Sequence, residues 1–223
     1  MKVRMVSRGK LIDGQQSCID GEEELVIYGF GGLEEVCYDK ELKGESDCFE
    51  RAARLSKQMK SVAVCGCITD TRGLKRKSAL VAENGKLCGI SDATRAVDGA
   101  MNAGAGLRVY DTQIGKMGVA VAEDILFPEV IGALAACGSD FIVCPFGALQ
   151  DTMPQVLIRS YAYLYGIPIF LCGIGYSVSV GADGEVVMAT PQSPVSLSME
   201  RRKEFHLVET RRRGIFNGLF CST

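Results

Sequence analysis

The stretch Leu107–Pro145, which reads LRVYDTQIGKMGVAVAEDILFPEVIGALAACGSDFIVCP, decides the fold of this 223-residue chain. Its first part predicts a hairpin with strands 107–111 and 117–122, because two apolar runs flank a glycine-containing turn. Pro128 suits the first turn of a helix, and Gly138 suits the end of that helix. The apolar run 141–144 then predicts a buried strand.

The same pattern of strands, helices and turn signals continues on both sides of this stretch. Asn84-Gly85 is the strongest hairpin signal in the chain, since both residues accept positive φ. Strands that alternate with helices and hairpins predict mixed sheets with parallel and antiparallel pairs. Further strands are expected at 3–6, 24–28, 61–68, 78–83, 87–90, 167–172, 176–180, 185–189 and 206–209, and helices at 47–59 and 152–165. No linker or low-complexity tract interrupts the pattern, so we expect a single domain over residues 1–223.

The helix expected at 47–59 carries a capping signature. Asp47 stands three residues before Glu50, which is the spacing of a capping box. One face of this helix is apolar and consists of Cys48, Ala52, Leu55 and Met59. The residues alone leave open whether two such sheets stack face to face or form one three-layer open sheet.

Composition excludes several classes of function. Hydrophobic residues make up 47% and charged residues 23% of the chain, as in ordinary globular proteins. The net charge of −2 gives no electrostatic reason to expect nucleic acid or an acidic membrane as a partner. No run of about 18 apolar residues occurs, so no membrane span is expected.

The unusual count is ten cysteines against one histidine. No CxxC pair occurs, and His206 lies far from Cys65-Gly66-Cys67, so neither a zinc site nor any other metal or cofactor is expected. Cysteines at 65, 137, 144 and 172 lie in apolar runs, where a free thiol packs as a small hydrophobic group. This usage predicts reduced thiols and a cytoplasmic location.

The stretch 107–145 resembles the nitrilase, or carbon–nitrogen hydrolase, superfamily. The resemblance extends over nearly the whole chain and implies an α/β fold, a four-layer α-β-β-α sandwich with mixed sheets, and a homodimer or higher homo-oligomer. It also implies an amide- or nitrile-like ligand and a Glu–Lys–Cys triad in which the thiol attacks the amide or nitrile carbon. The residues that carry the match are Asp111-Thr112, Gly115-Lys116, Gly118-Val119, Asp124, Phe127-Pro128-Glu129, Gly138 and Pro145.

The three triad positions depart from the family pattern together. The nucleophile position is Ala122, and a methyl group cannot attack a carbon. The position of the base falls on Phe30, whose ring accepts no proton. The lysine position falls near residues 91–94, where Asp92 stands instead and no lysine occurs. The segments 11–22 and 172–177 are also shorter than the family's, which indicates that loops around the pocket are trimmed.

Other residues suggest chemistry but have plainer explanations. Cys37-Tyr38-Asp39 repeats the family's nucleophile triplet but lacks its flanking strand and FPE motif, so we expect a surface loop there. Glu123 and Asp124 are acidic groups near the expected pocket, where they could act as acid or base. Asp124 and Glu129 match family positions with a structural role, so we expect that role here. Arg159 fits either a pocket wall or a solvated helix face. The basic groups 201–203 and 211–214 are expected on a solvated C-terminal surface.

Three hypotheses about function follow from these residues. The first is a catalytically degenerate nitrilase-fold protein that binds a small metabolite or a protein partner. The alternative is an active amidase or nitrilase with a relocated nucleophile, drawn from Cys88, Cys144 and Cys172, and with Asp92 or Glu123 as the base. The third is an assembly subunit that uses the family's dimer surface, which the residues do not separate from the first.

Overall fold

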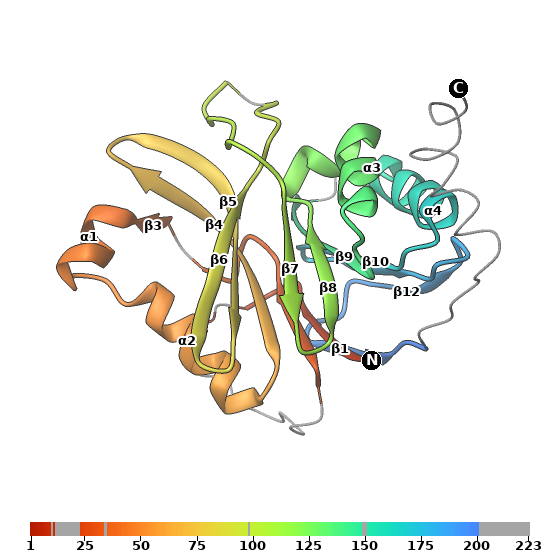
Figure 1. Ribbon diagram of the computed structural model, residues 1–223, viewed down its shortest axis with the longest axis horizontal. Coiled ribbons are helices and arrows are strands. Elements are labelled where there is room, and N and C mark those ends of the chain that lie inside the picture. The colour runs from red at the N-terminus through yellow and green to blue at the C-terminus, as the bar shows by residue number, and fades with distance from the viewer. Residues whose placement is uncertain (10, 12–22, 34, 98, 149–150, 201–223) are drawn as a thin grey trace, which may run out of the picture.

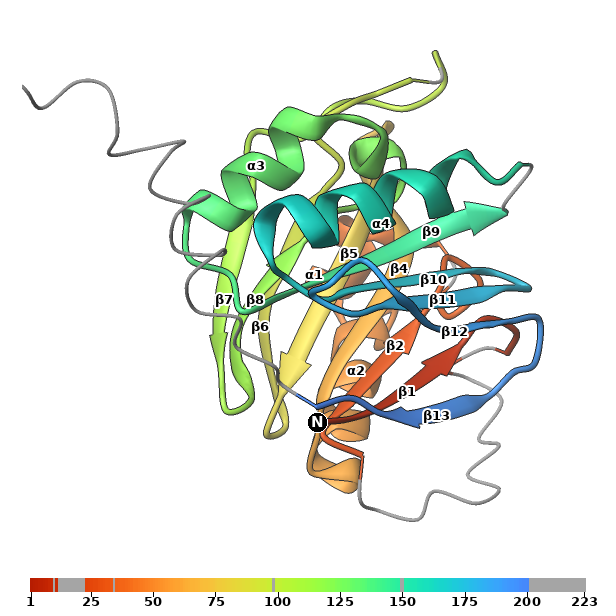
Figure 2. The ribbon, with the colours of Figure 1, turned by 90° about the vertical axis from the view of Figure 1, so that its right-hand side faces the viewer.

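Two mixed β-sheets stack face to face and carry helices on their outer faces (Figures 1 and 2). The computed structural model describes residues 1–9, 11, 23–33, 35–97, 99–148 and 151–200. Helix α2 covers one sheet, and α3 and α4 cover the other. This arrangement confirms the α-β-β-α sandwich and excludes the three-layer open sheet.

Over the described residues, the first sheet has seven strands: β13-β1-β2-β4-β5-β6 in order, and β3, which pairs with the far part of β4. Strands β1, β2 and β4 are parallel to one another, whereas β13, β5 and β6 are antiparallel to their neighbours. Its strands are β1 (Lys2–Val6), β2 (Leu25–Tyr28), β3 (Glu35–Cys37), β4 (Val62–Thr71), β5 (Leu74–Glu83), β6 (Lys86–Asp92) and β13 (Val195–Ser198).

In the part of the chain that the structure describes, the second sheet has six strands in the order β12-β11-β10-β9-β8-β7. Strands β8, β9 and β10 are parallel, and hairpins add β7 at one edge and β11 and β12 at the other. Its strands are β7 (Arg108–Thr112), β8 (Gly115–Val119), β9 (Phe141–Ala148), β10 (Ile169–Ile174), β11 (Ser177–Val180) and β12 (Val186–Thr190).

Side-chain alternation along the strands divides the core into three apolar layers. The central layer lies between the sheets and includes Val64, Ala122 and Phe170. A second layer packs α3 and α4 on one sheet, and a third packs α2 on the other. The helices are α1 (Tyr38–Lys43), α2 (Cys48–Met59), α3 (Pro128–Ala136) and α4 (Met153–Tyr165), with a 3₁₀ segment η2 (Ala122–Leu126).

Most elements match the sequence predictions, and the exceptions are short. Asn84 and Gly85 both have positive φ, as the predicted hairpin turn requires. Strands β3 and β13 and helix α1 were not predicted, because each has six residues or fewer and lacks a clear period. Residues 37–39 end β3 and begin α1, so the surface loop expected there is wrong. The strand expected at 206–209 and both basic clusters lie outside the described residues.

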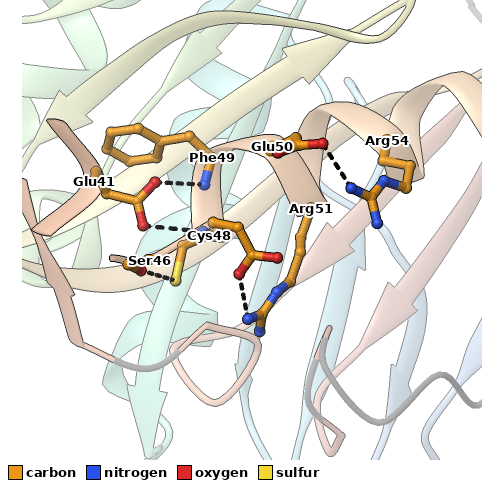
Figure 3. Close-up of polar contacts among 8 residues, drawn as sticks. Glu41, Ser46, Cys48, Phe49, Glu50, Arg51 and Arg54 are labelled. Carbon is orange, nitrogen blue, oxygen red and sulfur yellow. Dashed lines mark hydrogen bonds and ion pairs between the residues drawn. The ribbon is translucent and has the colours of Figure 1, made fainter. Parts of the chain in front are cut away.

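The predicted capping box of α2 is also wrong. The Asp47 side chain makes no capping bond and pairs with Arg51 instead. The carboxylate of Glu41, on the preceding helix, accepts the backbone N–H groups of Cys48 at 3.0 Å and Phe49 at 3.2 Å (Figure 3). This cap was not predictable from local spacing, because it depends on how the chain turns between α1 and α2.

We therefore expect Glu41→Ala to destabilise the protein by about 1 kcal/mol, since two N–H groups at the start of α2 lose their acceptor. Urea unfolding followed by circular dichroism measures the change as a lower midpoint with an unchanged slope. Glu45→Ala is the matched control, because Glu45 is an exposed glutamate in the same connection. Equal midpoints for the two variants would contradict the capping role.

Candidate functional site

The apolar layer between the sheets contains two of the three residues at which the sequence leads us to expect the triad. Phe30 follows the end of β2, and Ala122 opens η2 just after β8. Both pack in the central apolar layer, together with Ala93 and Cys172. The place where the family's chemistry is expected is therefore filled by apolar side chains and one thiol.

Asp92 lies on the other face of its sheet and does not join Phe30 and Ala122. Its carboxylate accepts a 2.7 Å hydrogen bond from the hydroxyl of Ser78, directly across the strand pair. The neighbouring Ser91 points the opposite way and bonds the Tyr110 hydroxyl of the second sheet at 2.9 Å. Since side chains alternate along a strand, the residue that faces Ala122 is Ala93 and not Asp92. The placement of Asp92 in the site is thus corrected.

Ala122 has a backbone conformation that alanine rarely adopts. Its φ is +50°, in the left-handed region, and only 1% of its surface is exposed. A non-glycine residue held there costs on the order of 1 kcal/mol and persists only where its surroundings fix it. The strand that was expected to continue to Ala122 ends at Val119, because the chain turns sharply into η2.

Asp124 fixes this turn. Its side chain is fully buried and accepts the N–H of Thr94 at 2.9 Å, the hydroxyl of Thr94 at 2.9 Å and the N–H of Arg95 at 3.0 Å. Burial raises the pKa of Asp124, and the bonds from Thr94 and Arg95 offset part of that effect. Asp124 therefore ties η2 to the chain that follows β6.

A lysine–glutamate pair next to Ala122 was missed by sequence reasoning. The ammonium of Lys77, on β5, lies 2.6 Å from a carboxylate oxygen of Glu123, and the two side chains are 21% and 24% exposed. Beside the pair lies a gap that is also lined by Ala93 and Met101 and has no room for a water molecule. The alternation of β5 could have indicated Lys77, because it shares the inward face with Ala79 and Val81.

Cys144 and Cys172 lie near the site but are buried. The Cys144 sulfur is 3.8 Å from the Ala122 carbonyl oxygen, and the Cys172 sulfur is 3.5 Å from the Ile27 carbonyl oxygen. Burial raises the pKa of Cys144 and raises that of Cys172 to about 12. Both thiols are therefore protonated at neutral pH.

The other residues singled out from the sequence lie away from this space. Cys88 is exposed within β6. Cys137 is exposed at the end of α3, so the expectation that it packs in an apolar run is wrong. Arg159 extends from α4 to donate to the Gly184 carbonyl oxygen at 3.1 Å, in the β11–β12 turn. Only residues 175–176 connect β10 to β11, so that connection is short.

Over the residues that the structure describes, no group of three or more His, Cys, Asp or Glu side chains is placed to hold a metal ion. No helix among them is both long enough and apolar enough to span a membrane.

Comparison with known proteins identifies the class. Residues 23–202 match the family model for carbon-nitrogen hydrolases, so the chain belongs to the carbon–nitrogen hydrolase family. A search of curated protein sequences finds no match.

Solved structures of the nitrilase superfamily share the fold at low sequence identity. Nit3 of Saccharomyces cerevisiae is 17% identical, with a TM-score of 0.72 over 97% of this chain and 94% of that one. A cysteine-to-alanine mutant of the Nesterenkonia AN1 amidase is 17% identical, with a TM-score of 0.75 over 96% and 95%. A carbon-nitrogen hydrolase from Helicobacter pylori G27 is 18% identical, with a TM-score of 0.73 over 96% and 92%.

Proposed function

We propose that this chain is a catalytically degenerate member of its family that binds a small metabolite or a protein partner instead of hydrolysing a carbon–nitrogen bond. The observation that carries the proposal is the buried methyl group of Ala122 on a strained turn, packed in one apolar layer with Phe30 and Ala93. None of these three side chains can attack a carbon, accept a proton or stabilise an oxyanion.

The polar pair beside this layer is chemically complementary to a small ligand with an amide-like group. Lys77 offers a positively charged donor, and Glu123 offers an acceptor 2.6 Å away. A primary amide presents the complementary groups, because its carbonyl accepts and its NH₂ donates. The gap beside the pair has no room for a water molecule, so such a ligand binds only where Lys77 and Glu123 move apart and exchange their mutual contact for bonds to the ligand.

The test is an assay of the extensively purified chain on panels of ω-amides, nitriles and N-carbamoyl compounds, with an active family member as the positive control. We expect no turnover above the rate without protein. Thermal shift on the same compounds measures binding, and Lys77→Met is expected to abolish any shift that Lys75→Met preserves. Turnover that stays constant through successive purification steps would refute the proposal.

The alternative, a relocated cysteine nucleophile, predicts a different labelling pattern from ours. At pH 7.5 we expect alkylating reagents to modify exposed Cys137 at least ~100-fold faster than Cys144 or Cys172, because burial holds both of the latter as thiols. Labelling of Cys172 should rise with pH up to about 12, as the thiolate forms. Mass spectrometry locates the label, and the denatured chain is the control for intrinsic reactivity. Rapid labelling of Cys144 or Cys172 would support the alternative.

A homodimer is also proposed, and the exposed face of α4 supports it. Met153, Val156, Tyr163 and Leu164 are each 50–56% exposed on this helix. Val156 and Tyr163 are seven residues apart and therefore lie on one side of the helix. The free thiols of all eight described cysteines support the proposed cytoplasmic location.

We expect the double variant Val156→Asp/Tyr163→Asp to be monomeric at concentrations where the natural chain is dimeric. Burying two carboxylates in an apolar interface costs far more than about 1.4 kcal/mol of binding free energy. Since about 1.4 kcal/mol corresponds to a tenfold change, the dissociation constant of the dimer should rise far more than tenfold. Light scattering coupled to size exclusion gives the mass. Leu42→Asp is the matched control, since Leu42 is 84% exposed on α1, at the opposite side of the sandwich. A dimer that survives in the double variant would place the interface elsewhere.

A further inference from the structure

An acidic groove lies at the end of the sandwich where the two outermost strands, β12 and β13, come together. It has a volume of about 400 Å³ and is formed by the β11–β12 turn, the start of β12 and the end of β13. Asp183, Glu185 and Glu200 place three carboxylates around it, and Val186 and Val187 supply an apolar wall. It is separate from the space around Ala122, which lies between the sheets.

Strand β12 leaves one of its edges open on this side. Among the described residues it pairs only with β11, and it ends the strand order of its sheet. Val186 and Val187 are 42% and 50% exposed. An open edge with exposed apolar side chains is prone to pair with another strand, and proteins usually cover or charge such edges. The acidic groups alone do not cover Val186 and Val187.

The sequence that follows the groove has the composition to cover it. Glu200 lines the groove, and the chain continues directly with Arg201-Arg202-Lys203. Residues 201–213 contain six basic and two acidic residues, whereas the groove carries three carboxylates. The next residues, 204–209, read EFHLVE and include the run 206–209 whose apolar content predicts a strand.

We propose that this groove is the docking site of residues 201–209 of the same chain. The basic residues 201–203 pair with Asp183 and Glu185, and residues 204–209 add a strand to the open edge of β12. Residues 201–209 follow Glu200, which itself lines the groove. The effective concentration of the segment at the groove is therefore high, and a weak intrinsic affinity is enough for docking. The docked segment covers Val186 and Val187 and closes an edge that would otherwise be open to association with other chains.

A charge-swap cycle in the full-length chain tests the proposal. Amide hydrogen exchange of the peptide that covers β12 is compared in the natural chain, Glu185→Lys, Arg202→Glu and the double variant. At low salt we expect each single change to speed exchange roughly threefold to fivefold, and the double variant to restore slow exchange, because it reverses both charges. The matched control is Asp111→Lys, since the Asp111 side chain is 86% exposed on β7, at the opposite edge of the sheet.

Three results would overturn the proposal. The first is exchange at β12 that is equally fast in all four chains, and the second is a double variant as fast as the single ones. The third is slow exchange that depends on protein concentration, which would assign the docked segment to a second copy. Melting temperatures of the variants within 2–3 °C of the natural chain, roughly the change from 1 kcal/mol, show that exchange reports docking and not unfolding.

Discussion

Replacing Asp124 by alanine is expected to destabilise the protein by about 3 kcal/mol, the largest effect of a single side chain near the site. The carboxylate is fully buried and accepts bonds from both the backbone and the hydroxyl of Thr94 and from the backbone of Arg95. Each buried donor left without an acceptor costs on the order of 1–3 kcal/mol. For a chain of this length, the melting temperature should fall by roughly 6–12 °C.

The effect of Asp124 should exceed that of the nearby acid Glu129. Glu129 is 55% exposed and contacts the guanidinium of Arg95, so Glu129→Ala should change stability by less than about 1 kcal/mol. The loss of stability in Asp124→Asn should lie between those of Asp124→Ala and Glu129→Ala. Its amide keeps one acceptor oxygen but turns an NH₂ group toward the Thr94 N–H. Calorimetry of the three variants measures the order. Equal losses for Asp124→Ala and Glu129→Ala would show that the buried carboxylate does not hold this turn.

Asp124 also explains why a strained turn persists without a catalytic group. Ala122 keeps a positive φ although its methyl group gains nothing from that conformation. The bonds from Asp124 to residues 94–95 fix η2, and the turn at Ala122 follows from them. The strained turn at Ala122 is thus held by hydrogen bonds that stabilise the fold.

The sequence predicted the scaffold well because its signals are local and repeated. The stretch 107–145 contains a hairpin, Pro128 at the first turn of a helix and a buried strand, and each was found, although the second hairpin strand ends at Val119 and not at Ala122. Short pieces such as β3 and β13 form only because a neighbouring strand offers them a partner. That partner comes from a distant part of the chain, so local periodicity gives no sign of it.

The site was predicted less completely, and the errors have physical causes. Phe30 and Ala122 both lie in the central apolar layer, because each stands at the end of an inner strand. Asp92 was assigned one residue away from the inward-facing position, and on a strand a shift of one residue exchanges the two faces of the sheet. Lys77 was missed because its partner Glu123 is 46 residues away in the sequence. Glu123 lies in η2, which follows β8 of the other sheet.

The backbone at Gly29, which precedes Phe30, is packed too closely against the other sheet to accept even a methyl group. A Cβ atom at Gly29 would lie 2.8 Å from the Gly173 carbonyl oxygen and 3.1 Å from that of Cys172. These are backbone atoms of β10, in the other sheet, and they cannot move aside as the end of a side chain does. The Gly29 N–H also donates to the Val6 carbonyl oxygen at 3.2 Å, which holds Gly29 in place.

We therefore expect Gly29→Ala to destabilise the protein by roughly 2–3 kcal/mol, the range of an overpacked core. Gly31→Ala is the control, because no atom lies within 4 Å of a Cβ at that position and its φ is not positive. Its stability should stay within about 0.5 kcal/mol of the natural chain, as judged by urea unfolding. Equal midpoints for the two variants would show that the sheets separate easily at this point. If Gly29→Ala is destabilised and Gly31→Ala is not, backbone contact between the two sheets sets the position of Phe30. Because a substitution at Phe30 leaves that backbone contact unchanged, it would not by itself rebuild a catalytic base there.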